Sequence, residues 1–304
     1  MCALACDTLR RVQGYGRASR RMQVADVMTP RADLVTATIP GSREDVLHIL
    51  QEREFSSVPI VKEVDGEEVF RGLVSRERLI EYPDEEQLAL LLDDIDPIAP
   101  DESLEALAKH MVETDARRVP VVNDGLAGIV TITDVVRAIA NGELEIDDEV
   151  GAYAGSRVHT IYIETPLTAA ERCLYYGREP YAVVLDDEGS MTGIVTEVDI
   201  VDVAEVVQGT EGTGDSIAGQ DSEWAWEGIK AMGNRILPTR NVELPDDPVS
   251  SVMTENVITV SGKRSVTETA QLLIGNDIEQ IPVRQGEHLT GIAKDMHLLH
   301  AIYE

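Results

Sequence analysis

The sequence predicts an α/β (α+β) protein made of four similar repeats, each running strand, helix, strand, strand, helix. An apolar-proline-apolar element recurs along the chain, and its prolines Pro59, Pro120 and Pro180 are spaced 61 and 60 residues apart. The next copy, at Pro282, follows after 102 residues, which indicates an insertion of about 40 residues before the last repeat. Recurrence at a fixed period is the sequence signature of a repeat architecture.

A helix is expected before each proline element, because apolar residues there recur with the 3.6-residue period of one helix face. The clearest run is Leu104, Leu107, Ala108 and Met111. The corresponding positions in the other repeats are Val46, Leu47 and Leu50, then Leu167, Ala170 and Leu174, then Val266, Ala270 and Leu273.

Two short strands are expected after each of these helices. The first contains the proline element, at 58–60, 119–121 and 281–283, with Glu179-Pro180-Tyr181 as a weaker copy. The second begins with a glycine, at 72–74, 128–130, 193–195 and 291–293, and a second helix follows it. A Rossmann fold is excluded, because no G-x-G-x-x-G lies between a strand and a helix.

A threonine and an aspartate stand where the glycine-led strand meets the second helix: Thr131 with Asp134, and Thr196 with Asp199. Free N–H groups and the positive helix end meet at such a junction, so an anion fits there. The threonine hydroxyl can add a phosphate contact, and the aspartate can accept hydrogen bonds from ribose hydroxyls. The alternative is structural, because Thr-x-x-Asp also caps helices, and the two roles can coexist.

Two arginines support a phosphate site. Arg118 and Arg178 both stand two residues before a proline position, in the same two repeats that carry Thr-x-x-Asp. Guanidinium groups suit phosphate oxygens, although an arginine in so acidic a chain can equally pair with surface carboxylates. Arg117 is a further candidate.

Together these elements resemble four cystathionine-β-synthase (CBS) domains in tandem, of a haloarchaeal type. The resemblance is carried by the opening segments 24–29 and 249–254, the proline elements, and segment 128–134 with its counterpart 193–199. It implies that repeats one and two pair into one Bateman module, and repeats three and four into another. The implied boundaries are a basic, disordered tail at 1–22, CBS 1 at 23–84, CBS 2 at 92–145, CBS 3 at 150–207, an insertion or linker at 208–245 and CBS 4 at 246–304.

The resemblance also implies a function. Four-repeat relatives include the γ subunit of AMP-activated kinase and archaeal stand-alone proteins, so we expect a regulatory, energy-sensing protein rather than an enzyme. It would bind AMP, ADP, ATP or S-adenosylmethionine in clefts between repeats and signal to an unidentified partner protein. A homodimer is a further expectation.

Residue roles follow from the same resemblance. The ribose is expected at Asp134 and Asp199, the phosphate at Thr131, Thr196, Arg118 and Arg178, and the adenine beside Ile98 and Ala99 or Ile161 and Tyr162. Repeats one and four depart from the pattern, because Arg78 stands in the aspartate position of the first, and Lys294 and His297 replace both positions in the fourth.

Charge narrows the possible partners. The chain has 26 basic and 56 acidic residues, a formal net charge of -30, which repels phosphate backbones and anionic lipid. Nucleic acid and membrane are therefore disfavoured, although the arginines of residues 8–25 keep a nucleic-acid-associated regulator open as one alternative. A ligand-independent scaffold is the other. The acidic excess with few lysines is typical of salt-in halophiles, so we expect the cytoplasm of a halophilic archaeon.

No catalytic or metal-binding constellation is predicted. The six histidines are scattered over different repeats, and Cys2, Cys6 and Cys173 are too few for a zinc site or a disulfide framework. No catalytic cofactor is expected. No stretch reaches the 18 apolar residues that a membrane helix needs.

Overall fold

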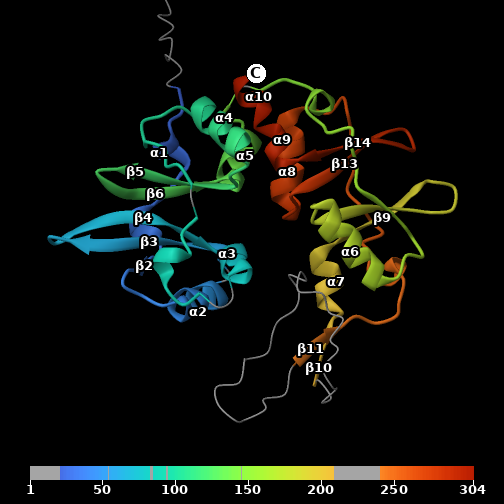
Figure 1. The fold of residues 1–304 in the computed structure, drawn as a ribbon. Helices are drawn as coiled ribbons and strands as arrows, with labels where there is room; N and C mark the ends of the chain where they lie inside the picture. Colours follow the sequence, from blue (N-terminus) through green and yellow to red (C-terminus); the bar gives the residue numbers. More distant parts are fainter. Residues whose placement is uncertain (1–20, 54, 83–84, 94, 145, 209–239) are drawn as a thin grey trace, which may run out of the picture.

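The computed structural model describes residues 21–208 and 240–304, apart from residues 54, 83–84, 94 and 145. Within them the chain forms four small three-stranded sheets with their helices, one for each predicted repeat (Figure 1). The predicted fold class is therefore confirmed. The predicted tail, apart from its last two residues, and residues 209–239 of the predicted insertion lie outside the described residues. No described helix is both long and apolar enough to cross a membrane.

The first two repeats occupy one half of the molecule. Repeat 1 contains α1 (Val24–Val27), β1 (Thr29–Pro30), the 3-10 helix η1 (Arg31–Asp33), β2 (Ala37–Thr38), α2 (Arg43–Arg53), β3 (Ser57–Val64), β4 (Glu67–Ser75) and α3 (Arg76–Glu81). After η2 (Leu88–Leu90), repeat 2 contains α4 (Leu104–Thr114), β5 (Arg118–Asn123), β6 (Gly125–Thr131) and α5 (Ile132–Ala140). The apolar face predicted for α4 is buried, as expected.

The other two repeats form the second half. Repeat 3 contains η3 (Val150–Ala152), β7 (Thr160–Tyr162), α6 (Leu167–Gly177), β8 (Tyr181–Leu185), β9 (Met191–Thr196) and α7 (Glu197–Asp202). The strands β10 (Glu205–Gln208) and β11 (Arg240–Glu243) pair with each other on either side of residues 209–239. Repeat 4 contains η4 (Val249–Ser251), β12 (Val260–Ser261), α8 (Val266–Asn276), β13 (Gln280–Gln285), β14 (His288–Lys294), α9 (Asp295–Leu298) and α10 (His300–Tyr303).

The strand register corrects one of the four predicted proline elements. In three repeats the residue after the proline pairs with the short parallel edge segment: Ile60 with Ala37, Val121 with Ile98, and Val283 with Val260. In repeat 3 the equivalent residue is Val184, because Val184 is opposite Gly193 just as Val121 is opposite Gly128, and Val184 pairs with Ile161 on the edge strand. The counterpart of Pro120 is therefore Val183 rather than Pro180.

Valine in place of proline at this position allows an additional backbone hydrogen bond in repeat 3. Val183 N donates a hydrogen bond to His159 O (2.9 Å), a bond that a proline at this position cannot donate. The edge strand β7 accordingly has three residues, whereas β2 and β12 have two.

Within each half, the repeats exchange their opening segments. Thr29, at the start of repeat 1, pairs with Ile129 on β6 of repeat 2, and Asp93, ahead of repeat 2, pairs with Leu73 on β4 of repeat 1. The second half repeats this exchange, with Thr254 against Ile194 and Gly155 against Ile292. The predicted pairing into two modules is therefore confirmed.

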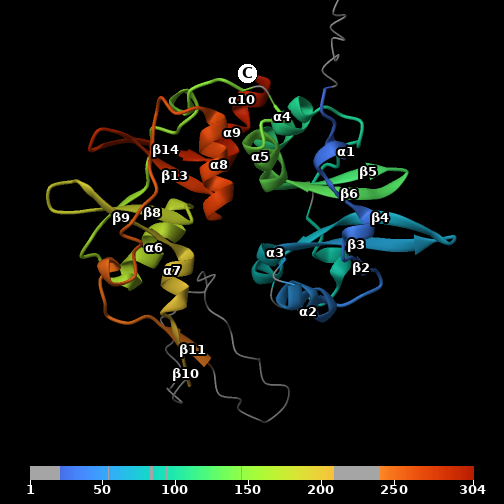
Figure 2. The ribbon, with the colours of Figure 1, turned by 180° about the vertical axis from the view of Figure 1, so that it is seen from behind.

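The two modules meet through repeats 2 and 4. Helix α5 packs against α8 and α9, and α10 packs against α4 (Figures 1 and 2). Buried apolar residues of both repeats form one core, which includes Leu107, Ile139, Leu273 and Leu298. Repeats 1 and 3 keep separate cores, and in the described chain α2 and α3 make no comparable contact with α6 and α7. Repeats 2 and 4 therefore join the two halves.

Candidate functional site

The strand-to-helix corner of repeat 2 is a reciprocal helix cap. The Thr131 N–H and hydroxyl both donate to Asp134 Oδ2, at 2.9 and 2.8 Å, and Asp134 N lies 3.4 Å from Thr131 Oγ1. Arg117 O accepts from Ile132 N at 2.8 Å. The capping role considered for Thr-x-x-Asp is thus present, and two of the first amides of α5 already have partners.

The second oxygen of the Asp134 carboxylate faces a replaceable partner. Asp134 Oδ1 accepts from Arg137 Nη1 at 2.9 Å, and the Arg137 side chain is 51% exposed whereas that of Asp134 is 15% exposed. Exposed ion pairs contribute little stability. Ribose hydroxyls can therefore take the place of Arg137 at small cost, while Oδ2 keeps its capping bonds.

Repeat 3 has the same corner. The Thr196 N–H and hydroxyl donate to Asp199 Oδ2 at 2.8 and 2.7 Å, and Asp199 N lies 3.4 Å from Thr196 Oγ1. The described residues supply no hydrogen-bond donor to Asp199 Oδ1. The sequence spacing thus correctly predicted a matched pair of corners, each half-buried.

Arg118 lies between the corners of repeats 1 and 2. It is directly opposite Thr131 in the β5–β6 pairing, and its Nη1 lies 3.5 Å from Ser56 O of repeat 1. Ser56 O also accepts from Arg76 N, the first amide of α3. The guanidinium is therefore placed between two repeats, where the resemblance expects a phosphate.

Arg178 does not share this position, and the prediction that the two arginines are equivalent is wrong. Arg178 is the left-handed C-cap of α6 (φ 53°), the counterpart of Asp115 after α4. The residue opposite Thr196 is Tyr181, which is buried. The error follows from aligning Pro180 with Pro120, and it leaves repeat 3 without an arginine in the Arg118 position.

The corner of repeat 1 contains a carboxylate that sequence reasoning missed. Asp93 Oδ2 accepts from Ser75 N at 3.0 Å, the bond that Asp134 makes with Thr131 N in repeat 2. Arg78 Nε lies 3.8 Å from Asp93 Oδ1, and the Arg78 guanidinium stacks over the Tyr82 ring at 4.6 Å. Asp93 comes from the exchanged segment, so no motif within repeat 1 signals it.

The corner of repeat 4 is filled by its own side chains. Lys294 Nζ lies 2.5 Å from Glu179 Oε2 of repeat 3 and 5.3 Å from the centre of the Tyr181 ring. His297 Nδ1 accepts from Lys294 N at 3.3 Å. Burial, together with the nearby Lys294 charge, lowers the pKa of His297 below its ordinary value.

The residues expected at the adenine lie on the edge segments. Ile98 pairs with Val121 and Ile161 with Val184, so the two are equivalent, and Ala99 and Tyr162 follow them. Thr131 is two strands away from Ile98 across the sheet and three residues further along it, and Thr196 is placed in the same way relative to Ile161. Each of these separations, across the strands and along them, is roughly 10 Å. The residues expected at the adenine and the corner threonines are therefore not neighbours in the sheet.

An open hollow lies elsewhere. It measures about 430 Å³ and lies at the far end of β12 and β13, away from Lys294. Its lining consists of Thr259, Val260, Ser261, Lys263, Arg284, Gln285 and Gly286. In the described ranges no group of three or more His, Cys, Asp or Glu side chains is arranged to hold a metal ion.

Known proteins share this architecture. A crystal structure of an uncharacterized conserved protein from Pyrococcus horikoshii is 27% identical, with a TM-score of 0.65 over 92% of this chain and 100% of that chain. Protein MJ1225 from Methanocaldococcus jannaschii, proposed as an archaeal homologue of γ-AMPK, is 15% identical with a TM-score of 0.61, over 92% of this chain and 99% of that one. At 15% identity this second likeness shows the fold alone.

A curated relative extends beyond this chain. The uncharacterized protein MJ1404 of Methanocaldococcus jannaschii is 25% identical over 281 residues, which are 92% of this chain and 61% of that protein. This chain thus spans less than two thirds of that relative's length. The CBS domain family matches residues 24–85, 90–141, 150–205 and 249–304, one match for each repeat. Because these matches cover most of the sequence, the chain belongs to the CBS-domain family.

Proposed function

We propose that this chain is a non-catalytic regulatory protein that binds an adenosine-containing ligand at the corners of repeats 2 and 3. One observation carries the proposal. In both corners one carboxylate oxygen of the aspartate accepts hydrogen bonds from its threonine. The second oxygen can accept hydrogen bonds from ribose hydroxyls, because the exposed Arg137 is its partner in Asp134 and no described residue donates to it in Asp199. The corners are thus prearranged without depending on a ligand for their stability.

The arginines distinguish the two proposed sites. The corner of repeat 2 has Arg118 opposite Thr131, and guanidinium groups bind phosphate oxygens well. The corner of repeat 3 has the buried Tyr181 in the equivalent position. We therefore assign AMP, ADP or ATP to repeat 2, and to repeat 3 an adenosyl ligand that depends less on its phosphate, such as S-adenosylmethionine.

Titration calorimetry tests the assignment. Asp134→Ala should weaken nucleotide binding by about 1.5 to 3 kcal/mol, the usual scale for a charged hydrogen bond, and Asp199→Ala should do the same at repeat 3. Because both aspartates also cap helices, Ser103→Ala is the matched control. It removes the cap of α4, where Ser103 Oγ accepts from Ala106 N at 3.2 Å, and should leave affinity unchanged. Unchanged affinity in both aspartate variants defeats the site assignment.

A ligand-independent scaffold is favoured by a different observation. The corners of repeats 1 and 4 are occupied by the chain's own ion pairs, Arg78 with Asp93 and Lys294 with Glu179. Thermal unfolding separates the two functions, because a ligand at 100 times its dissociation constant adds about 2.7 kcal/mol to stability. No change with AMP, ATP or S-adenosylmethionine supports the scaffold.

The proposal also covers the cellular location, the partner protein and the oligomeric state. We place the protein in the cytoplasm of a salt-rich archaeon because of its net charge of -30, and we assign its output to a partner protein whose interface changes with ligand occupancy. A homodimer is proposed from the family resemblance alone.

A further inference from the structure

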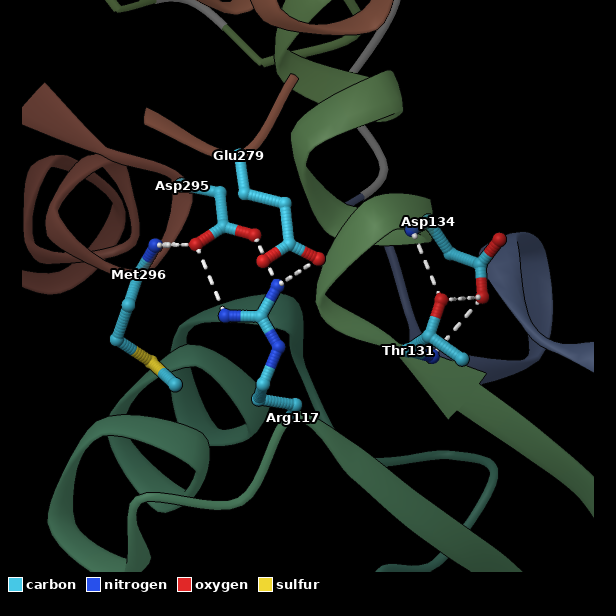
Figure 3. Close-up of polar contacts among 6 residues, drawn as sticks. All are labelled: Arg117, Thr131, Asp134, Glu279, Asp295 and Met296. Atoms are coloured by element: carbon cyan, nitrogen blue, oxygen red, sulfur yellow. Dashed lines mark hydrogen bonds and ion pairs between the residues drawn. The ribbon is translucent and has the colours of Figure 1, made fainter. Parts of the chain in front are cut away.

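A guanidinium–carboxylate clamp joins the two modules beside the corner of repeat 2. Arg117 Nη1 and Nη2 of repeat 2 lie 3.2 and 2.6 Å from Asp295 Oδ1 and Oδ2 of repeat 4, and Nη2 also lies 2.9 Å from Glu279 Oε1 (Figure 3). The two-pronged contact is the strong form of such a pair. Among the described residues Asp295 is the only charged residue that is buried, with 6% of its surface exposed.

The backbone of Arg117 belongs to the proposed nucleotide site. Its carbonyl accepts from Ile132 N, the first amide of α5, and the next residue, Arg118, is opposite Thr131. Only the Arg117 side chain is directed away, toward repeat 4 (Figure 3). Burial lowers the pKa of Arg117, but hydrogen bonds and charge from Asp295 and Glu279 raise it more, so the group stays charged.

A carboxylate and a phosphate offer a guanidinium the same pair of oxygens. We propose that Asp295 is an internal competitor for Arg117. When a nucleotide occupies the corner of repeat 2, its phosphate takes Arg117 from Asp295, and the contact between repeats 2 and 4 loosens at this point. The inference rests on the proposed function and names the regulation of that site.

The loosening follows from burial. A buried carboxylate that loses its partner charge is strongly destabilised, so Asp295 must reach water once Arg117 has turned. Its remaining hydrogen bond, from Met296 N at 2.7 Å, offsets only part of that cost. Ligand binding and module packing are then coupled, and by linkage a variant that weakens the clamp must bind nucleotide more tightly.

The test compares AMP with adenosine on wild type and two variants by titration calorimetry. Asp295→Asn keeps the size of the side chain and removes its charge, so AMP should bind at least about fivefold more tightly, while adenosine affinity should not change. Arg117→Gln combined with Asp295→Asn leaves a neutral pair and should bind AMP more weakly than Asp295→Asn alone, because only Arg118 is then left for the phosphate. Gln271→Met is the matched control, because it removes the Gln271 Nε2 bond to Ala140 O (2.9 Å) across the same interface without touching Arg117.

The outcomes separate this inference from the proposed function. Equal AMP affinity in wild type and Asp295→Asn, or weaker binding in the variant, overturns the competition while leaving the nucleotide site intact. A gain of the same size in Gln271→Met also overturns it, because general loosening would then suffice. If neither AMP nor adenosine binds any form, the repeat 2 nucleotide site fails first and the competition fails with it. If Asp295→Asn does not fold, the double variant decides, since AMP affinity as high as wild type excludes a phosphate role for Arg117.

Discussion

In every repeat, the N–H of the residue before the second helix donates to a side chain. Asp134 and Asp199 accept it three residues ahead, and His297 does so in repeat 4. In repeat 1, where Arg78 occupies that place, Asp93 accepts it from the exchanged segment. The corner is thus a structural requirement of the fold, and the proposed ligand binding is an added role at those corners whose second carboxylate oxygen stays accessible.

The pKa of His297 predicts a pH dependence of stability. Because burial and then Lys294 lower this pKa in the folded protein, the unfolded chain takes up the proton first as the pH falls. The free energy of unfolding should therefore decrease as the pH drops through about 6.5 toward the lower folded value. Urea unfolding in molar KCl measures it, and His297→Gln should lose less stability on acidification than wild type.

The control for this prediction is His288→Gln, a change at an exposed histidine of the same repeat. It should keep the wild-type pH dependence. An identical pH dependence in His297→Gln and wild type would show that the buried ring contributes nothing to the acid sensitivity.

At the residue scale, contacts between residues close in sequence could be predicted from their spacing, whereas contacts between distant segments could not. Thr131 with Asp134 and Thr196 with Asp199 could be predicted because three residues of helix fix their geometry. Asp93 at the corner of repeat 1 and Asp295 on Arg117 depend on how segments far apart in sequence fold together. No sequence motif encodes either contact.

Among the elements, the opening segments depend on glycines in the strands that receive them. A Cβ at Gly128 would lie 2.5 Å from Thr29 O and 2.9 Å from Met28 Sδ. At Gly193 the corresponding distances are 3.0 Å to Thr254 O and 2.7 Å to Met253 Sδ. The recurring glycine of the second strand therefore serves close approach between repeats, although it lies within the strand and does not open it as predicted, since β6 begins at Gly125 and β9 at Met191.

Gly128→Ala should accordingly destabilise the protein by about 1 to 3 kcal/mol, the range for overpacking, since a backbone oxygen cannot yield without moving the segment. Chemical unfolding measures the change. Gly275→Ala provides the comparison, because it lies within α8 with nothing inside 4 Å of the new Cβ and should instead stabilise by about 0.5 to 1 kcal/mol. A neutral Gly128→Ala would contradict the close packing of β1 on β6.

The helices were predicted correctly from the 3.6-residue period of their apolar residues. The strand of repeat 3 was misaligned because a single proline was used to locate it. The buried faces of α4, α6 and α8 follow the 3.6-residue pattern. Proline was a misleading marker, because the middle strand only requires a buried residue at that place and Val183 meets the requirement. Aligning Pro180 with Pro120 also made Arg178 look equivalent to Arg118, which is wrong.

In the whole molecule, two modules are joined through one pair of repeats. The shared core of repeats 2 and 4 and the Arg117–Asp295 clamp lie on the same interface, so a change at one corner can alter how the halves pack. The family resemblance predicted the pairing within modules. It did not predict which repeats join the modules, because the apolar helix faces of all four repeats look alike.

Net charge predicts how the whole chain responds to salt. A formal charge of -30 destabilises the compact state through self-repulsion, and molar salt shortens the screening length to about 3 Å. The free energy of unfolding should therefore rise strongly between about 0.1 and 2 M KCl. Unfolding that is independent of KCl would remove the halophilic interpretation.

Binding stoichiometry tests the central claim most directly. Equilibrium dialysis of the full chain in molar KCl, with radiolabelled AMP, ATP and S-adenosylmethionine in separate experiments, should find one site for AMP or ATP and a second site for S-adenosylmethionine. At ligand concentrations near the wild-type dissociation constants, Asp134→Ala should lose most of the AMP or ATP binding, Asp199→Ala should lose most of the S-adenosylmethionine binding, and the double variant should lose most of both. Absence of binding by all three compounds, or the same number of sites in wild type and the double variant, would contradict the account.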